Sequence, residues 1–140
     1  MIIYIINGPN FNYLGKREVN IYGNLSFKQI LLKIKKKFKN IKIKYFQTNS
    51  ESKIIDILYF LNKKKNIKGI LLNAAAYSHT SLAISDCIKS IKIPIIEIHM
   101  SNIFKRSIIR NKSLISKNCK GIIIGLGINS YILGIYNFLI

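Results

Sequence analysis

The sequence predicts an α/β fold in which a five-stranded parallel sheet carries helices on both faces. Short apolar runs alternate with amphipathic stretches along the 140 residues, and each run is apolar at consecutive positions instead of every second one. Strands that are apolar on both sides are typical of a parallel sheet buried between two layers of helices. Because the chain is long enough for one such core and too short for two ordinary ones, we expect a single domain over residues 1–140.

The apolar runs are the expected strands, and helices fill the intervals between them. The clearest helix begins after Ser26, which Gln29 follows three residues later as in a capping box, and it carries apolar side chains at helical spacing as far as Phe38. Further helices are expected over residues 52–64, after Thr80 and after Asn129. The expected strands span residues 2–6, 41–46, 69–72, 93–98 and 121–124.

Polar side chains gather after the expected strands. Ligands of parallel α/β folds bind beyond the carboxyl ends of the strands, so these side chains are candidates for a site. They are Asn7, Asn10, Asn49, Glu51, Asn73, His79, His99 and Ser101. Gly125 and Gly127 follow the last strand. A dinucleotide fingerprint has a third glycine and follows the first strand, so we interpret these two glycines as a tight turn.

The net charge of +18 makes a polyanion such as RNA an alternative partner. The lysines are spread along helix-like segments that are rich in Ile and Asn, and no aromatic-plus-basic RNA-binding motif accompanies them. We therefore expect no nucleic-acid partner. The rival hypothesis, a basic RNA-binding module on the same fold, predicts an affinity that falls steeply with salt.

The chain shows no signal for a membrane or for an oxidising compartment. Residues 121–140 carry no charge, but glycines and asparagines divide this stretch into a strand, a turn and a helix, which argues against a membrane span. The first apolar run lacks a preceding basic segment and passes into a turn at Gly8 and Pro9, which favours a strand over a signal peptide. Cys87 and Cys119 form no CxxC pair. We expect a cytoplasmic protein.

Two pairs of side chains suggest acid–base chemistry. Arg17 and Tyr22 lie in a loop bounded by Gly15 and Gly23. A tyrosine that acts as a general base at neutral pH must offset an ionisation cost of about 4 kcal/mol, and a neighbouring cation can supply this. Glu97 and His99 share one face of an extended segment, where the carboxylate can orient an imidazole acid. The chain therefore contains one candidate base and one candidate acid.

Three further charged residues have two interpretations each. Asp86 follows His79 by seven residues, so the two can share a helix face, or Asp86 is an ordinary surface acid. Arg106 and Arg110, four residues apart, suit an anionic ligand or a solvated surface. The histidines and Asp86 match no metal-binding spacing, so we expect no metal.

Several blocks, in order, carry a resemblance to a known family: residues 6–10, 14–18, 21–23, 47–51, 72–81, 94–102 and 125–127. Over nearly its whole length the chain resembles the type II 3-dehydroquinate dehydratases. The resemblance implies a hydro-lyase of the shikimate pathway of aromatic amino acid biosynthesis, which removes water from 3-dehydroquinate to give 3-dehydroshikimate. It also implies a flavodoxin-like fold, no cofactor, and self-association as trimers grouped into a homododecamer.

The resemblance implies a role for each candidate residue. Tyr22, as a tyrosinate assisted by Arg17, takes a proton from the carbon next to the ketone, and an enolate forms. His99, oriented by Glu97, then protonates the departing hydroxyl. The implied binding residues are Asn10 for the water on the enolate oxygen, Asn73, His79 and Arg110 for hydroxyls, Met100 and Ser101 for the carboxylate, Asp86 in a neighbouring subunit's site, and Arg106 in the active-site shell.

The chain departs from the family pattern at three places. Ala74 and Ala75 replace the usual Pro-Gly or Gly-Gly, which we expect to stiffen or shift the loop that presents His79. Residues 107–109 replace an acidic pair and an aromatic residue, and Phe104 stands at a commonly polar position. Because the acid, the base and the arginine are all retained, we expect an enzyme instead of a degenerate structural relative.

Overall fold

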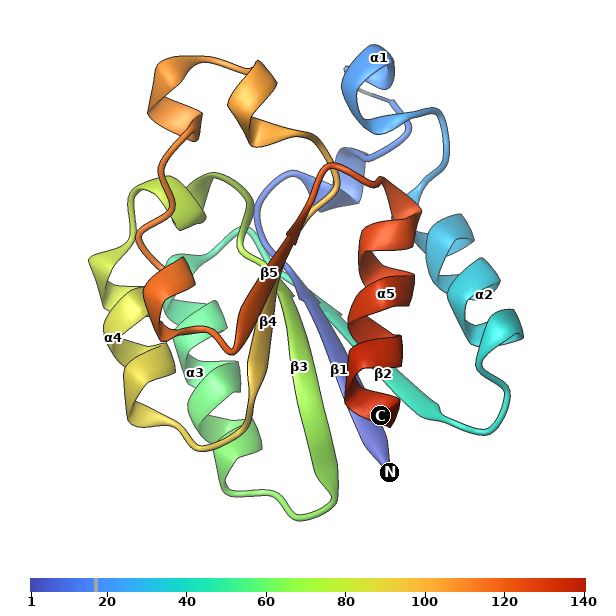
Figure 1. Ribbon diagram of the computed structural model, residues 1–140, viewed down its shortest axis with the longest axis vertical. Helices are drawn as coiled ribbons and strands as arrows, with labels where there is room; N and C mark the ends of the chain where they lie inside the picture. The colour runs from blue at the N-terminus through green and yellow to red at the C-terminus, as the bar shows by residue number, and fades with distance from the viewer. Residues whose placement is uncertain (17) are drawn as a thin grey trace.

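The computed structural model describes residues 1–16 and 18–140, whose strands form a five-stranded parallel sheet (Figure 1). The strand order is β2-β1-β3-β4-β5, the flavodoxin-like order, and it confirms the predicted α/β architecture. The strands are β1 (Ile2–Asn7), β2 (Lys42–Gln47), β3 (Ile67–Asn73), β4 (Ile95–His99) and β5 (Gly121–Ile124).

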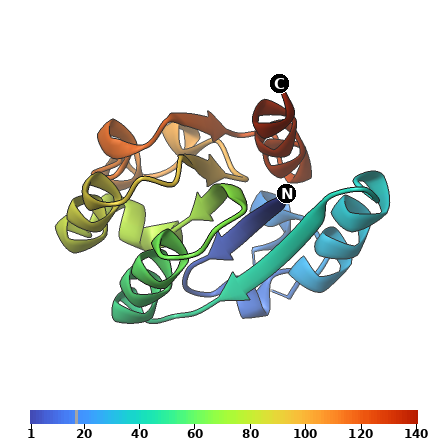
Figure 2. The same ribbon diagram turned by 90° about the horizontal axis from the view of Figure 1, so that it is seen from below.

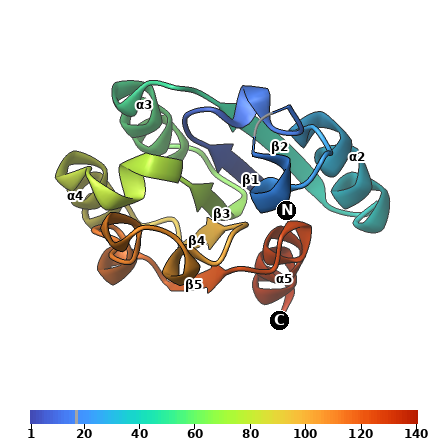
Figure 3. The ribbon, with the colours of Figure 1, turned by 90° about the horizontal axis from the view of Figure 1, so that it is seen from above.

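Four longer helices cover the two faces of the sheet in pairs. As Figures 2 and 3 show, α2 (Phe27–Lys37) and α5 (Ile128–Leu139) lie on one face, and α3 (Glu51–Asn62) and α4 (Leu82–Ser90) lie on the other. A short helix, α1 (Val19–Tyr22), rises above the carboxyl end of the sheet (Figure 1). It lies in the predicted loop, which is bounded by Gly15 and Gly23 at φ of 89° and 83°.

Serine caps fix where three of these helices begin. Ser26 forms the predicted capping box of α2: its Oγ accepts from the Gln29 N–H at 3.2 Å, and its own N–H donates to Gln29 Oε1 at 2.8 Å. The side chains of Ser50 and Ser81 cap α3 and α4 by accepting from the backbone N–H groups of Lys53 and Ile84. Each such cap contributes about 1 kcal/mol to helix stability.

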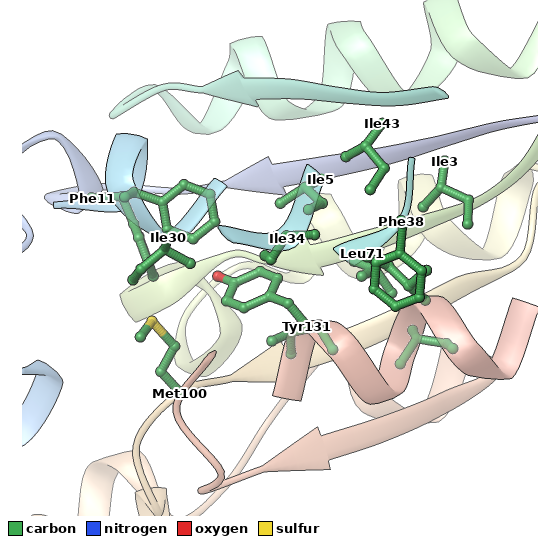
Figure 4. Close-up of a cluster of buried hydrophobic side chains, with 14 of the residues drawn as sticks. Ile3, Ile5, Phe11, Ile30, Ile34, Phe38, Ile43, Leu71, Met100 and Tyr131 are labelled. Carbon is green, nitrogen blue, oxygen red and sulfur yellow. The ribbon is translucent and has the colours of Figure 1, made fainter. Parts of the chain in front are cut away.

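The core has two parts, one on each face of the sheet. Figure 4 shows the part between the sheet and the α2–α5 pair, in which Ile5, Ile34 and the fully buried Tyr131 pack together. The part beneath α3 and α4 contains Leu58 and Leu72, which are also fully buried. Burial of side chains of this size contributes about 1.5–3 kcal/mol each.

Two strand starts differ from the prediction by two residues, and the other strand boundaries agree within one residue. β3 begins at Ile67, two residues earlier than expected, and β4 begins at Ile95, two residues later. The late start of β4 follows from Pro94, which has no N–H to donate to the ladder; its carbonyl accepts from the Ile70 N–H at 3.0 Å.

Residues 121–140 form β5, a glycine turn and α5, as predicted. Gly125 and Gly127 have φ of 88° and 57°, which glycine adopts without strain. Within the described part of the chain, no helix has both the length and the apolar character needed to span a bilayer.

Candidate active site

A pocket lies at the carboxyl ends of β1, β3 and β4, the predicted position for a ligand. In Figures 1 and 3, α1 and the segment after β4 rise around this end of the sheet. The pocket spans about 590 Å³ when the space open to solvent is included. Its lining includes nine predicted residues: Asn10, Tyr22, Asn73, His79, His99, Met100, Ser101, Arg106 and Arg110.

Two of the predicted residues that the structure describes are not in this lining. Glu97 lies behind His99 in β4 and is fully buried. Asp86 is exposed on α4, away from the pocket lining. Arg17 lies outside the described residues. The interpretation that His79 and Asp86 share a helix face was wrong, because His79 ends a separate 3₁₀ turn before α4 begins.

Glu97 and His99 form a buried hydrogen-bonded pair. Nε2 of His99 lies 2.6 Å from Glu97 Oε1, and because a carboxylate only accepts, we assign the proton between them to the imidazole. Alternation along β4 places the two side chains on one face of the strand, as predicted.

Two serines that the sequence did not single out also bind Glu97. Ser113 Oγ donates to Oε1 at 2.7 Å, and Ser116 Oγ donates to Oε2. Burial raises the pKa of Glu97, but the hydrogen bonds from His99, Ser116 and Ser113 outweigh it and leave the pKa below its usual value. Glu97 is therefore a carboxylate at neutral pH.

The hydroxyl of Tyr22 meets a guanidinium from a distant part of the sequence. Arg106 Nη1 donates to Tyr22 Oη at 2.6 Å, and the Arg106 Cζ lies 5.4 Å from the centre of the tyrosine ring. α1 supplies the tyrosine, and the irregular segment after β4 supplies the arginine. The sequence placed Arg106 in the site but did not predict this contact.

His79 presents an acceptor to the pocket. Its Nδ1 lies 2.8 Å from the carbonyl oxygen of Lys112, so Nδ1 carries the proton and Nε2 keeps a lone pair. Burial lowers the pKa of His79, and the nearby charges of His99 and Arg110 lower it further, although the bond to Lys112 opposes this. The imidazole is neutral at pH 7 and lies 6.0 Å from the His99 ring, centre to centre.

A buried hydrogen-bond chain fixes the amide of Asn73. Its Nδ2 donates to Tyr131 Oη at 3.0 Å, and that hydroxyl donates to Asn7 Oδ1 at 2.8 Å. Asn73 Oδ1 accepts from the Ala75 N–H at 3.1 Å. Because Tyr131 is fully buried, burial raises the pKa of its phenol well above the usual value, so it stays a neutral donor. Asn73 therefore keeps one N–H for a ligand.

The alanines that replace the family's usual residues are tightly held. Ala75 has φ of 52°, a left-handed conformation that costs a side-chain-bearing residue about 1–2 kcal/mol. Ala74 lies against Gly8, where an added Cβ would come within 2.6 Å of the Ala74 carbonyl oxygen. The loop that presents His79 is therefore strained at Ala75 and closely packed at Ala74.

Comparison with known proteins identifies the family. A family model described as dehydroquinase class II matches residues 1–139. The chain belongs to the class II dehydroquinase family.

Individual relatives agree with this family. The chain is 50% identical over 135 residues to a 3-dehydroquinate dehydratase of Clostridium botulinum (strain Hall), which covers 95% of this chain and 90% of that protein. The crystal structure of a type II dehydroquinase from Butyrivibrio crossotus DSM 2876 superposes with a TM-score of 0.95 at 39% identity, over 100% of this chain and 98% of the other. One from Propionibacterium acnes gives a TM-score of 0.91 at 30% identity, over 99% and 97%.

Replacing Ala75 by glycine is expected to stabilise this dehydroquinase-family chain by about 0.5–1 kcal/mol. Glycine removes the energetic cost of the left-handed conformation. That cost is larger than the destabilisation caused by the greater conformational entropy of glycine in the unfolded chain. The matched control is Ala76→Gly, at an exposed neighbour without positive φ, which should be destabilising by about 0.5–1 kcal/mol. Urea unfolding of both variants checks this; equal destabilisation would contradict the strain at Ala75.

The lowered pKa of His79 predicts a loss of stability in mild acid. The folded state binds a proton at His79 more weakly than the unfolded state does. The contribution of neutral His79 to the free energy of unfolding is therefore complete above about pH 6.5 and declines as the pH falls below that value. Between about pH 7.5 and 5.5, the parent should lose more unfolding free energy than His79→Gln. Urea titrations at both pH values measure this difference, and equal losses would refute it.

Proposed function

We propose that this chain is a hydro-lyase that removes water from 3-dehydroquinate to give 3-dehydroshikimate, a step of the shikimate pathway. The family and the relatives named 3-dehydroquinate dehydratase support this reaction. The observation that carries it is one pocket in which a phenol and an imidazole, Tyr22 and His99, are each hydrogen-bonded to a group of complementary charge, Arg106 and Glu97.

Tyr22 is the proposed general base. An elimination next to a ketone begins with removal of a proton from the adjacent carbon, and a phenolate is basic enough to take it. The guanidinium of Arg106, 2.6 Å from the phenol oxygen, favours the phenolate and the negative charge of the enolate that follows. Arg17, the predicted partner, is proposed as a second cation for the same oxygen.

His99 is the proposed general acid. Its Nε2 is bound to Glu97, so Nδ1 is the nitrogen that gives a proton to the departing hydroxyl. The proton moves from imidazolium to hydroxyl, the C–O bond breaks, and water leaves as the enolate collapses to the conjugated enone. The ionised Glu97 offsets the positive charge of the imidazolium before this step.

The remaining pocket residues are proposed to orient the substrate. The His79 Nε2 accepts from a hydroxyl, and the free N–H of Asn73 donates to one. Arg110 binds a further hydroxyl, while Ser101 and the backbone at Met100 hold the carboxylate. Asn10 holds the water on the enolate oxygen. These groups together match a polyhydroxylated carboxylate, the chemical class of 3-dehydroquinate.

Tyr22→Phe is expected to lower kcat by about 10²- to 10⁴-fold, because the ring stays and only the proton-accepting oxygen is lost. Tyr13→Phe is the matched control: Tyr13 is exposed at the end of a 3₁₀ turn, Phe11–Tyr13, and lies outside the pocket lining. Ultraviolet absorbance of the enone product gives both rates. Parent-like turnover by Tyr22→Phe would remove the proposed base.

We also propose that the chain acts as a single catalytic domain in the cytoplasm and assembles as trimers grouped into a homododecamer. Asp86 is exposed on α4 and outside the pocket lining of its own chain, which suits the proposed role in a neighbouring subunit's site. Large exposed apolar side chains such as Phe60 and Ile108 offer surface for contacts between subunits.

The assembly predicts a solution mass twelve times that of the 16.1 kDa chain. Because each chain carries a net charge of +18, subunits repel one another, and salt should strengthen the assembly by screening this repulsion. Light scattering after size-exclusion chromatography, at low and moderate salt, measures the mass. A monomer at both salt concentrations would contradict the dodecamer.

A further inference from the structure

The segment from Lys112 to Ser116 holds the ends of both histidine rings that face away from the substrate. The Lys112 carbonyl accepts from His79 Nδ1, and Ser113 and Ser116 bind Glu97, the partner of His99 Nε2. We propose that Ser113 and Ser116 are positioning residues that hold Glu97 ionised and thereby favour the protonated form of His99. This inference rests on the proposed function, since it concerns the acid of that reaction.

Ser113 can bond Glu97 only as a donor. Its Oγ accepts the backbone N–H groups of Ile115 and Ser116, each at 3.3 Å, and lies 2.7 Å from Glu97 Oε1. A serine hydroxyl has two acceptor sites and one proton. With both acceptor sites used by the backbone, the proton of Ser113 points at Glu97, which favours an oxygen without a proton there.

Ser116 fixes the second carboxylate oxygen. Its hydroxyl donates to Oε2, while Ser113 and His99 donate to Oε1. Oε1 already accepts two donors, so a proton on that oxygen would displace one of them. Because Glu97 has no exposed surface, its charge is costly unless donors and a cation balance it, and His99 is the group in position to become that cation.

The segment that carries these serines is itself firmly attached. The Leu114 N–H donates to the Ser78 carbonyl at 2.8 Å, and the Leu114 carbonyl accepts from Ser85 Oγ at 2.8 Å. These bonds tie the segment to the turn that carries His79 and to α4. The serine hydroxyls therefore meet Glu97 from a fixed backbone, as a positioning role requires.

Other titratable and charged groups of the described residues lie near the pair. His79 lies 6.0 Å from the His99 ring, and Tyr22, Arg106 and Arg110 line the same pocket. Beside Glu97, burial and the carboxylate charge raise the pKa of Cys119 to about 12, so this thiol is neutral. The arginines keep their charge at all pH values of interest. His79 is therefore the group to distinguish from His99 in a titration near neutral pH.

The test is removal of the two hydroxyls, singly and together, in the full-length enzyme. We expect Ser113→Ala/Ser116→Ala to lower kcat about three- to tenfold with KM changed less than about twofold, because charge-assisted bonds to the carboxylate are lost while the pocket lining is untouched. In the double variant, less of His99 should remain as imidazolium as the pH rises. The basic limb of its kcat profile against pH should therefore move to lower pH by about half to one unit.

Three comparison variants separate positioning from folding. Ser113→Thr keeps the hydroxyl and should restore the parent's pH profile. Ser116→Ala alone keeps the bonds from the backbone N–H groups of residues 115 and 116 to Ser113 Oγ, so this variant replaces the double variant if that one does not fold. Ser52→Ala, which removes an exposed hydroxyl bonded only to Ser50 among the described contacts, should match the parent.

Imidazole NMR supplies a readout that needs no turnover. The chain has two histidines, so His79→Gln assigns the His99 ring signals. Loss of the hydroxyls should move the His99 titration to lower pH by about half to one unit. An unchanged titration and pH profile in a folded double variant would overturn the inference while leaving the proposed function standing. If the parent protein has no dehydratase activity but the double variant still shows the NMR shift, the proposed function is wrong and the coupling between the serines and the carboxylate stands.

Discussion

The ionised carboxylate of Glu97, buried in the fourth strand, is the constraint on which the site depends. A charge without solvent contact persists only where donors surround it, and this one has an imidazole and two hydroxyls. Those donors come from β4 itself and from the segment before β5. The carboxylate therefore links β4, which carries His99, to the segment with Ser113 and Ser116 that precedes β5.

The pocket separates its charges by function. On one side a guanidinium meets the phenol of Tyr22, and on the other the carboxylate of Glu97 meets the imidazole of His99. In the same lining, His79 is kept neutral by burial and by its neighbours' charges, so its Nε2 can accept a hydrogen bond but has no proton to give. A substrate in this space would meet a phenol bound to a guanidinium, an imidazole bound to a carboxylate and a neutral imidazole acceptor.

The sequence was sufficient for the sheet and for most of the pocket. Apolar runs identified the strands, because strands buried on both faces need consecutive apolar residues, and Ser26 with Gln29 identified the start of α2. The family resemblance placed Tyr22, His79 and His99 together. It did not reveal Ser113 or Ser116, whose only sequence signal is a pair of hydroxyls in a polar segment.

Contacts set by three-dimensional packing were the hardest to predict. The bond between Arg106 and Tyr22 joins residues 84 positions apart, and no local pattern indicates which arginine reaches the phenol. α4 was predicted to follow Thr80, but the interpretation that His79 shares a helix face with Asp86 was wrong, because His79 ends a 3₁₀ turn that precedes α4. Arg17 lies outside the described residues, so its predicted role stays a prediction.

The hydrogen bond between Asn7 and Tyr131 spans 124 positions, so opposite ends of the described sequence must meet before the Asn73 amide is held in place. Contacts of such long range form late, after the entropy of closing a large loop has been overcome. An intermediate with native-like helices and strands but an undocked α5 would therefore lack an ordered binding site. Recovery of activity during refolding should accordingly follow the docking of the last helix and not the early gain of secondary structure.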